Sequence, residues 1–163
     1  MTLAPVDALA GFDRSRGSGP LAGVDEAGRG ALAGPVVAAA VVCEPGEELG
    51  RVRDSKLVPE KEREELYERI VRAAGAWCVG IVGPDEIDRT NILLATMCAM
   101  KQAVAGLGMR PGLVLVDGNR LPEIACPAEA VTGGDRKSFV IAAASIVAKV
   151  TRDRIMRERD RDY

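Results

Sequence analysis

Four carboxylates stand at points where apolar runs give way to glycine or polar residues. Asp25 and Glu26 close one apolar run. Asp117 directly follows another, and Asp135 precedes a third. Hard divalent cations take oxygen ligands, and two such ions about 3.5–4 Å apart can hold a phosphodiester and its attacking water. The four acids therefore favour a two-metal hydrolytic site.

Each of these acids also has a purely structural explanation. The pair Asp25 and Glu26 is compatible with a strand end that turns into solvent, and Asp117-Gly118 is a common turn. Asp135 is placed where a carboxylate can cap a following helix or complement its dipole. Position along the chain leaves these alternatives open, so the metal-site hypothesis depends on whether the fold brings the four side chains together.

The composition limits the chemistry available to such a site. The chain has no histidine, which excludes His-ligated zinc and Ser-His-Asp triads. Its four cysteines form no Cys-x-x-Cys pair, and we expect them to be buried, reduced thiols. The formal net charge of −2 gives little support for a polyanionic partner. Hydrolysis would then depend on carboxylates, lysine or metal ions.

Strand and helix patterns alternate along the chain. Apolar runs of β-branched or small residues predict strands, whereas helical spacing bounded by capping residues predicts helices. The predicted strands, of which the first two form a hairpin, are Leu21–Glu26, Pro35–Cys43, Ala76–Val82 and Leu113–Val116. The predicted helices are Pro59–Ala74, Thr90–Leu107 with Thr90 as N-cap, and Ser138 to about Arg159 with a solvated, fraying end. This interleaving predicts an α/β protein.

The length and composition predict one globular domain. The chain has 163 residues, of which 47% are hydrophobic. Residues 1–20 mix Pro, Gly, Ser and charges, so we expect a flexible leader there and a single domain over residues 21–163. The longest apolar run, Ala31–Cys43, is shorter than the roughly 20 residues of a membrane-spanning helix, and no secretion signal is visible. We expect a cytoplasmic protein.

Ordered motifs over most of the chain resemble those of one enzyme family. The first motif is Gly23-Val24-Asp25-Glu26-Ala27-Gly28-Arg29-Gly30, followed by Leu32-Ala33-Gly34-Pro35-Val36-Val37-Ala38-Ala39-Ala40. The later motifs are Asp54-Ser55-Lys56-Leu57, Asn91-Ile92-Leu93 with Ala95-Thr96-Met97, Val116-Asp117-Gly118-Asn119, Gly134-Asp135, Ile141-Ala142-Ala143-Ala144-Ser145-Ile146, Ala148-Lys149-Val150 and Arg152-Asp153. In content and order, residues 21 to about 160 resemble ribonuclease HII, the type 2 ribonuclease H family.

The resemblance implies a fold, a site and an activity. The implied fold is ribonuclease H-like, with a central mixed β-sheet flanked by helices. The implied catalytic carboxylates, which would hold Mg²⁺ or Mn²⁺, are Asp25, Glu26, Asp117 and Asp135. The implied reaction cuts the RNA strand of RNA/DNA hybrids, including ribonucleotides embedded in DNA, and leaves 5'-phosphate and 3'-hydroxyl ends. We expect a monomer that removes ribonucleotides during DNA replication and repair.

The segment Gly28-Arg29-Gly30 is a candidate for substrate recognition. Two glycines allow backbone groups to approach a ribose closely, and Arg29 supplies positive charge. The structural alternative is a tight hairpin turn. The resemblance implies that this segment reads the 2'-hydroxyl beside the scissile phosphate, the group that separates RNA from DNA.

Further along the chain, basic and hydroxyl side chains are candidates for contact with the duplex backbone. Lys56 is a candidate phosphate contact, unless Asp54-Ser55-Lys56 is only a turn. Ser145, Lys149 and Arg152 share one face of the last predicted helix. That face either meets the nucleic acid or is simply solvated.

Two rival functions follow from what the motifs do not cover. Relatives that the resemblance implies continue past the position of Tyr163 with a segment that carries a tyrosine at the substrate, and Tyr163 does not match that tyrosine. We therefore expect a C-terminally short catalytic domain, and the first rival is a hybrid-binding fragment without catalysis. The second rival is a ribonuclease H-like DNA resolvase, which would share the acids but would not need Gly28-Arg29-Gly30.

Overall fold

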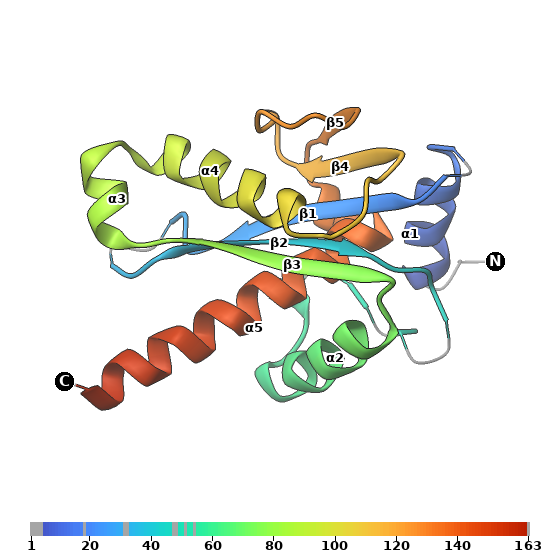
Figure 1. The fold of residues 1–163 in the computed structure, drawn as a ribbon. Helices are drawn as coiled ribbons and strands as arrows, with labels where there is room; N and C mark the ends of the chain where they lie inside the picture. Colours follow the sequence, from blue (N-terminus) through green and yellow to red (C-terminus); the bar gives the residue numbers. More distant parts are fainter. Residues whose placement is uncertain are drawn as a thin grey trace.

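The described part of the chain contains one five-stranded mixed sheet with helices on both faces (Figure 1). The strands are β1 (Leu21–Ala27), β2 (Val36–Val42), β3 (Ala76–Val82), β4 (Leu113–Asp117) and β5 (Ala128–Val131), in the order β3-β2-β1-β4-β5. Strand β2 pairs antiparallel with β1 and β3, whereas β4 runs parallel to β1 and β5. The predicted α/β class and the opening hairpin are confirmed.

The computed structural model describes residues 5–17, 19–30, 33–46, 49–50, 52–53 and 55–162. Three residues named in the sequence motifs or at the chain end, Leu32, Asp54 and Tyr163, lie outside these ranges. The first four predicted strands agree with β1 to β4 to within one residue at each end. Strand β5 was not among the predicted elements, because its four residues, Ala-Glu-Ala-Val, form no apolar run.

The helices are α1 (Pro5–Arg14), α2 (Glu60–Ala73), α3 (Pro84–Arg89), α4 (Ile92–Ala105) and α5 (Phe139–Asp162), with short 3-10 helices η2 (Ser55–Leu57) and η3 (Gly134–Arg136). The predicted helix over 90–107 is wrong at its start. The Thr90 hydroxyl donates to the carbonyl of Glu86 at 2.8 Å and so belongs to the end of α3. Asn91 is the actual N-cap of α4, because its side chain accepts the Leu94 N–H at 2.8 Å. In the described residues, no helix has the combination of length and apolar character that crossing a membrane requires.

Helix α1 occupies part of the segment that composition marks as a leader. Its Leu9 and Ala10 are buried against the core. The Asp13 carboxylate accepts the Ser138 hydroxyl at 2.6 Å and the Val140 N–H at 3.0 Å. Burial raises the pKa of Asp13, while these hydrogen bonds act in the opposite direction. Asp13 therefore ties α1 to the first turn of α5, a contact that no pattern in the sequence indicates.

Alternate residues of the strands pack into two cores on opposite faces of the sheet. Val24 and Val116 pack under α4, whereas Leu115 packs under α5. Figure 1 shows α4 over one face and α5 with α2 across the other. Helix α5 lies very close to β1, because a Cβ at Gly23 would collide with the backbone of Val140. This close approach fixes the start of α5 against the first half of β1.

All four cysteines are free thiols. Cys43 is buried, and this burial raises its pKa to about 12. Cys78 and Cys126 are half-buried and Cys98 is exposed, so the expectation of buried cysteines is confirmed at Cys43 alone.

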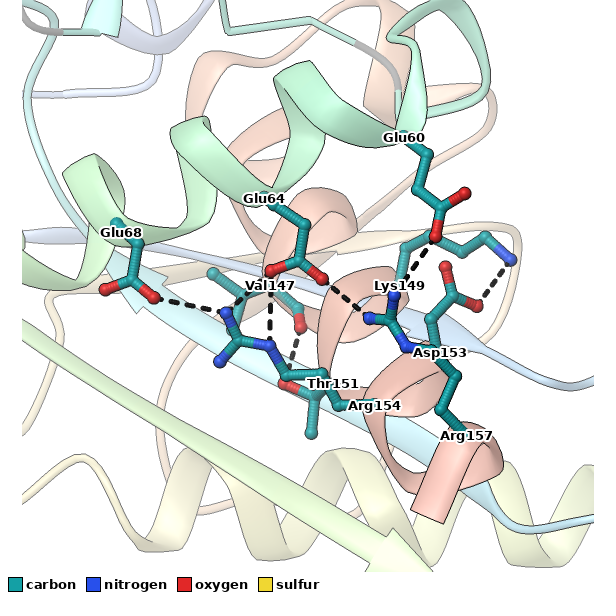
Figure 2. Close-up of polar contacts among 9 residues, drawn as sticks. All are labelled: Glu60, Glu64, Glu68, Val147, Lys149, Thr151, Asp153, Arg154 and Arg157. Atoms are coloured by element: carbon teal, nitrogen blue, oxygen red, sulfur yellow. Dashed lines mark hydrogen bonds and ion pairs between the residues drawn. The ribbon is translucent and has the colours of Figure 1, made fainter. Parts of the chain in front are cut away.

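The charged end of α5 is held by an ion-pair ladder to α2 (Figure 2). Arg154 pairs with Glu64 at 2.7 Å and with Glu68 at 3.1 Å. Arg157 pairs with Glu64 at 2.7 Å and with Glu60 at 3.2 Å. We call these five residues the α2–α5 ladder. The prediction of a fraying end is wrong, because α5 stays helical to residue 162. The prediction of a solvated face is confirmed in part, because residues 157, 158, 160 and 161 are exposed although Arg154 and Arg157 contact α2.

Replacement of Glu64, the shared member of the α2–α5 ladder, should lower stability in a pH-dependent way. Hydrogen bonds from Arg154 and Arg157 hold the pKa of Glu64 below its usual range, so its stabilising effect is present above the unfolded pKa and is lost as the pH falls through the folded one. Because the pairs are about a third exposed, Glu64→Gln should cost only about 0.5–1 kcal/mol at pH 7.

Urea unfolding of both proteins at pH 7 and pH 3 measures this difference. Glu65→Gln, on the exposed side of the same helix, is the control and should change little. Equal destabilisation by Glu64→Gln at both pH values would contradict an ionic origin.

Candidate metal centre at the strand ends

Asp25 and Asp117 lie side by side at the C-terminal ends of two parallel strands. The register of β1 and β4 pairs Val24 with Val116, so the carboxylates that follow are neighbours. Side chains alternate along a strand, and both aspartates therefore leave the sheet on the face of Leu115, which is packed under α5. The parallel pairing of the two apolar strands thus places both acids at the same point of the sheet edge.

Asp135 reaches the same point from η3, between β5 and α5. Its backbone N–H donates to Oδ1 of Asp117 at 3.4 Å. The neighbouring Gly134 allows this approach, since a Cβ there would stand 3.2 Å from Asp117 Oδ1 and 2.6 Å from the side chain of Ile141. As a result, one oxygen atom each of Asp25, Asp117 and Asp135 lies within 4.8 Å of the others.

Glu26 borders this group and does not belong to it. As the next residue on β1, its side chain starts on the opposite face of the strand from Asp25. Its backbone N–H donates to Oδ1 of Asp25 at 2.8 Å, and its own Oε2 is buried without a hydrogen-bond partner among the described residues. The structure thus brings three of the four predicted ligands together, and the role of Glu26 stays a prediction.

The electrostatics of the group call for a positive charge. Asp25 is only 5% exposed and Asp135 only 8%. Burial raises the pKa of Asp25 well above its ordinary value, and the negative charges of Asp117 and Glu26 raise it further. Either a proton or a cation relieves this repulsion, and oxygen ligands at this spacing suit a hard divalent cation. The chemistry of the donor set therefore fits Mg²⁺ or Mn²⁺.

The segment Gly28-Arg29-Gly30 leaves β1 directly after these acids and turns toward β2. Gly28 has a φ of 94°, in the left-handed region that favours glycine. Arg29 is exposed, and its charge lowers the pKa of Glu26 against the larger effect of burial. The predicted substrate-recognition segment therefore lies next to the carboxylates.

Two other predicted substrate contacts, Lys56 and Ser145, occupy neighbouring elements. Lys56 is exposed on η2. Ser145 is only 3% exposed, and its hydroxyl donates to the carbonyl of Ala142 at 2.7 Å while it accepts the Ser55 N–H at 3.3 Å. In this structure the Ser145 hydroxyl binds the backbone of η2, and its burial leaves the side chain without access to a duplex.

Lys149 and Arg152, which share a predicted face with Ser145, differ from each other. The Lys149 side chain is 38% exposed and pairs with Asp153 at 3.0 Å. Arg152 is only 9% exposed, and it donates to the carbonyls of Ala33 at 2.7 Å and Pro35 at 3.0 Å. The expectation that Arg152 meets the duplex or solvent is therefore wrong, because its guanidinium is taken up by the turn between β1 and β2.

Two cations that the sequence motifs do not include follow Asp135. Arg136 and Lys137 follow Asp135 directly, at the end of η3, and both are exposed. Their adjacency to a candidate ligand was the available signal. They are further candidates for contact with phosphate groups, which require positive charge near a negatively charged site.

Neutralising Asp25 should stabilise the metal-free protein. Because the folded-state pKa of Asp25 is raised, the contribution of Asp25 to stability is most favourable below the unfolded pKa near 3.8 and is lost as the pH rises through the folded pKa. Asp25→Asn removes the repulsion and keeps an acceptor for the Glu26 N–H, so the melting temperature at pH 7 in a chelator should rise by roughly 2–4 °C.

The exposed Asp88→Asn is the matched control and should leave the melting temperature unchanged. At acidic pH the gain from Asp25→Asn should disappear, because the wild-type carboxyl is then protonated. A variant that melts below the wild type at pH 7 would show that the carboxylate is not a source of repulsion.

Known proteins with a similar chain are ribonucleases. The chain is 52% identical to ribonuclease HII of Burkholderia cenocepacia (strain HI2424) over 150 residues, which are 92% of this chain and 70% of that protein. It is 56% identical to ribonuclease HII of Maricaulis maris (strain MCS10) over 145 residues, or 88% and 66% of the two chains. The crystal structure of ribonuclease H2 from Pyrococcus horikoshii OT3 superposes with a TM-score of 0.76 at 31% identity and covers 88% of this chain and 76% of that one.

A family model agrees with these pairwise matches. The model described as ribonuclease HII matches residues 22–163, which include both strands and the 3-10 helix that carry the three clustered aspartates. The five-stranded mixed sheet flanked by helices is the fold that the resemblance predicts. The chain belongs to the ribonuclease HII family and is a ribonuclease H-type hydrolase.

Proposed function

We propose that the chain is an endoribonuclease that hydrolyses the RNA strand of RNA/DNA hybrids, including ribonucleotides embedded in DNA. The observation that carries this proposal is the convergence of Asp25, Asp117 and Asp135 within 4.8 Å at the strand ends of a ribonuclease HII family member. In a chain without histidine, such a group of oxygen ligands can supply phosphodiester hydrolysis through bound metal ions.

Two divalent ions, Mg²⁺ or Mn²⁺, are the proposed cofactors, and Asp25, Asp117 and Asp135 with Glu26 would hold them. When bound, such ions polarise the scissile phosphate and lower the pKa of the attacking water. The role of the chain is to fix these carboxylates on rigid elements, since three lie on strands β1 and β4 and one lies on η3. The proposed products carry 5'-phosphate and 3'-hydroxyl ends.

The duplex would lie across the end of the sheet that carries the carboxylates. Gly28-Arg29-Gly30 is proposed to read the 2'-hydroxyl, since it adjoins the acids and exposes Arg29. Lys56 and Lys149, from η2 and α5, are proposed phosphate contacts. With a net charge of −2, the chain depends on these few local cations and on bound metal to attract a polyanion.

The cellular side of the proposal follows from this activity. Removal of ribonucleotides during DNA replication and repair, in the cytoplasm and as a monomer, is the role we propose. Light scattering of the purified chain at increasing concentration tests the monomer, because a rising mass would contradict it.

Cleavage should depend on metal and on Asp117. The 163-residue chain with Mn²⁺ or Mg²⁺ should cut both a full RNA/DNA hybrid and a DNA duplex with one ribonucleotide. Asp117→Asn removes a ligand and should lower the rate at least roughly 100-fold, the upper end of losses caused by changes behind metal ligands. Gel analysis of end-labelled substrates gives the rates and the product ends.

Asp88→Asn serves as the matched control and should cut at the wild-type rate. Retained hybrid binding without any cut would favour the hybrid-binding fragment. Comparable cleavage of an all-DNA junction would favour a resolvase and would contradict the proposal.

Arg29→Ala should impair substrate recognition and leave the metal site intact. Loss of a hydrogen bond from a charged donor costs roughly 1.5–3 kcal/mol, so kcat/KM on the hybrid should fall roughly 10- to 100-fold. The Mn²⁺ affinity, measured by calorimetry, should stay within about twofold. Equal loss of metal affinity and turnover would refute the assignment of this segment to the ribose.

A further inference from the structure

We propose that Arg152 of α5 is a positioning residue that holds the described parts of the turn between β1 and β2, residues 28–30 and 33–35, and thereby sets the preference for ribose over deoxyribose. The inference rests on the proposed function, because it assigns the ribose-reading role to Gly28-Arg29-Gly30. Arg152 does not reach the substrate in this account, since its side chain is buried beneath the turn. It acts through the backbone that it holds.

The guanidinium of Arg152 forms hydrogen bonds with the backbone just before β2. Its Nε donates to the carbonyl of Pro35 at 3.0 Å, and its Nη2 donates to the carbonyl of Ala33 at 2.7 Å. Hydrogen bonds from an ionised donor are stronger than neutral ones, and the planar fork fixes the two carbonyls relative to each other. Ala33 and Pro35, which precede β2, are therefore both hydrogen-bonded to a single side chain of α5.

Glycines at both ends of the turn pack against the same side chain. A Cβ at Gly28 would collide with Nε of Arg152, and a Cβ at Gly34 would stand 3.0 Å from its Nη2 and 2.5 Å from Sδ of Met156. Both glycines have a φ near 90°, 94° for Gly28 and 92° for Gly34. The two glycines thus do two things at once: they permit the left-handed backbone, and they leave the space that the guanidinium fills.

Arg152 connects the turn structurally to the candidate metal centre. Gly28 is the first residue of Gly28-Arg29-Gly30, so the point at which Arg29 leaves the protein is set by packing against Arg152. Helix α5, which carries Arg152, follows directly after η3 with Asp135. One helix therefore holds both the ribose-reading turn and a metal ligand, and small shifts in reacting geometry are costly for catalysis.

The substitution Arg152→Met tests the proposal, because it keeps the length of the aliphatic stem and removes both donors. Arg152→Lys keeps the charge but lacks the fork, and it serves as a second variant if Arg152→Met does not fold by circular dichroism. The control is Arg154→Met, two residues along the same helix, whose guanidinium pairs with Glu64 and Glu68 on α2.

A first measurement needs no substrate. Trypsin needs a locally extended backbone at the bond that it cuts, so release of the turn should speed cleavage after exposed Arg29. The fragment that starts at Gly30 is identified by mass. We expect this cut to be at least about fivefold faster in Arg152→Met and Arg152→Lys, while the cut after Arg89, an exposed site on α3, keeps its rate. Unchanged cleavage after Arg29, or equal acceleration at both sites, would overturn the positioning role.

A second measurement asks whether the turn controls ribose preference. An unlabelled all-DNA duplex competes against cleavage of the matching hybrid, and the ratio of its inhibition constant to the KM of the hybrid reports the preference. This ratio should fall at least about tenfold in Arg152→Met and Arg152→Lys, and it should stay at the wild-type value in Arg154→Met. In an Arg29→Ala background the further change should be less than about twofold, because both residues act through one turn.

The two measurements separate the inference from the function on which it rests. If the Arg152 variants are cut faster by trypsin but the wild-type chain cuts no hybrid, Arg152 does position the turn. The proposed function is then refuted, and the link to ribose with it. A wild-type ratio in Arg152→Met, or the same fall in Arg154→Met, would overturn the inference while the proposed function stands.

Discussion

Mutual repulsion among three carboxylates is the constraint on which the rest of this structure depends. Asp25 and Asp117 are adjacent because two parallel strands end at the same edge of the sheet and point alternate residues to the same face. A folded chain tolerates such a group where strong packing holds it and a proton or a cation neutralises part of its charge. The apolar strands supply the packing, and the oxygen ligands supply the reason for a divalent cation.

Helix α5 carries out the remaining positioning. Its start lies against β1 at Gly23, and the preceding η3 brings Asp135 to Asp117 at the end of β4. Its middle holds the turn between β1 and β2 through Arg152, and its charged end is fixed by the α2–α5 ladder (Figure 2). The long helix is therefore more than a cover for the sheet, because it links the candidate metal ligands, the candidate ribose-reading segment and η2.

The sequence predicts the elements that repeat a simple pattern. Strands β2 and β3 are apolar throughout, whereas β1 and β4 are apolar runs that lead into acids within a distinctive motif. Thr90 and Asn91 both suit helix caps, so pattern alone does not show that α3 ends at the first and α4 begins after the second. Strand β5 has no apolar run, and α1 lies in a segment rich in glycine and charge.

Buried polar side chains were harder to predict than the acids. Ser145 and Arg152 share a helix face with Lys149, but helical spacing does not reveal which part of the chain covers that face. The turn between β1 and β2 covers Arg152, and η2 covers Ser145. Both contacts join residues about 90 or more positions apart, which only the tertiary fold brings together.

The claim that the clustered carboxylates form a divalent-cation site is tested most directly by calorimetric titration of Mn²⁺ into the folded chain. The account predicts saturable binding that Asp117→Asn abolishes and Asp88→Asn leaves unchanged. Absence of binding to the folded wild type, or the same binding in Asp117→Asn, would contradict it.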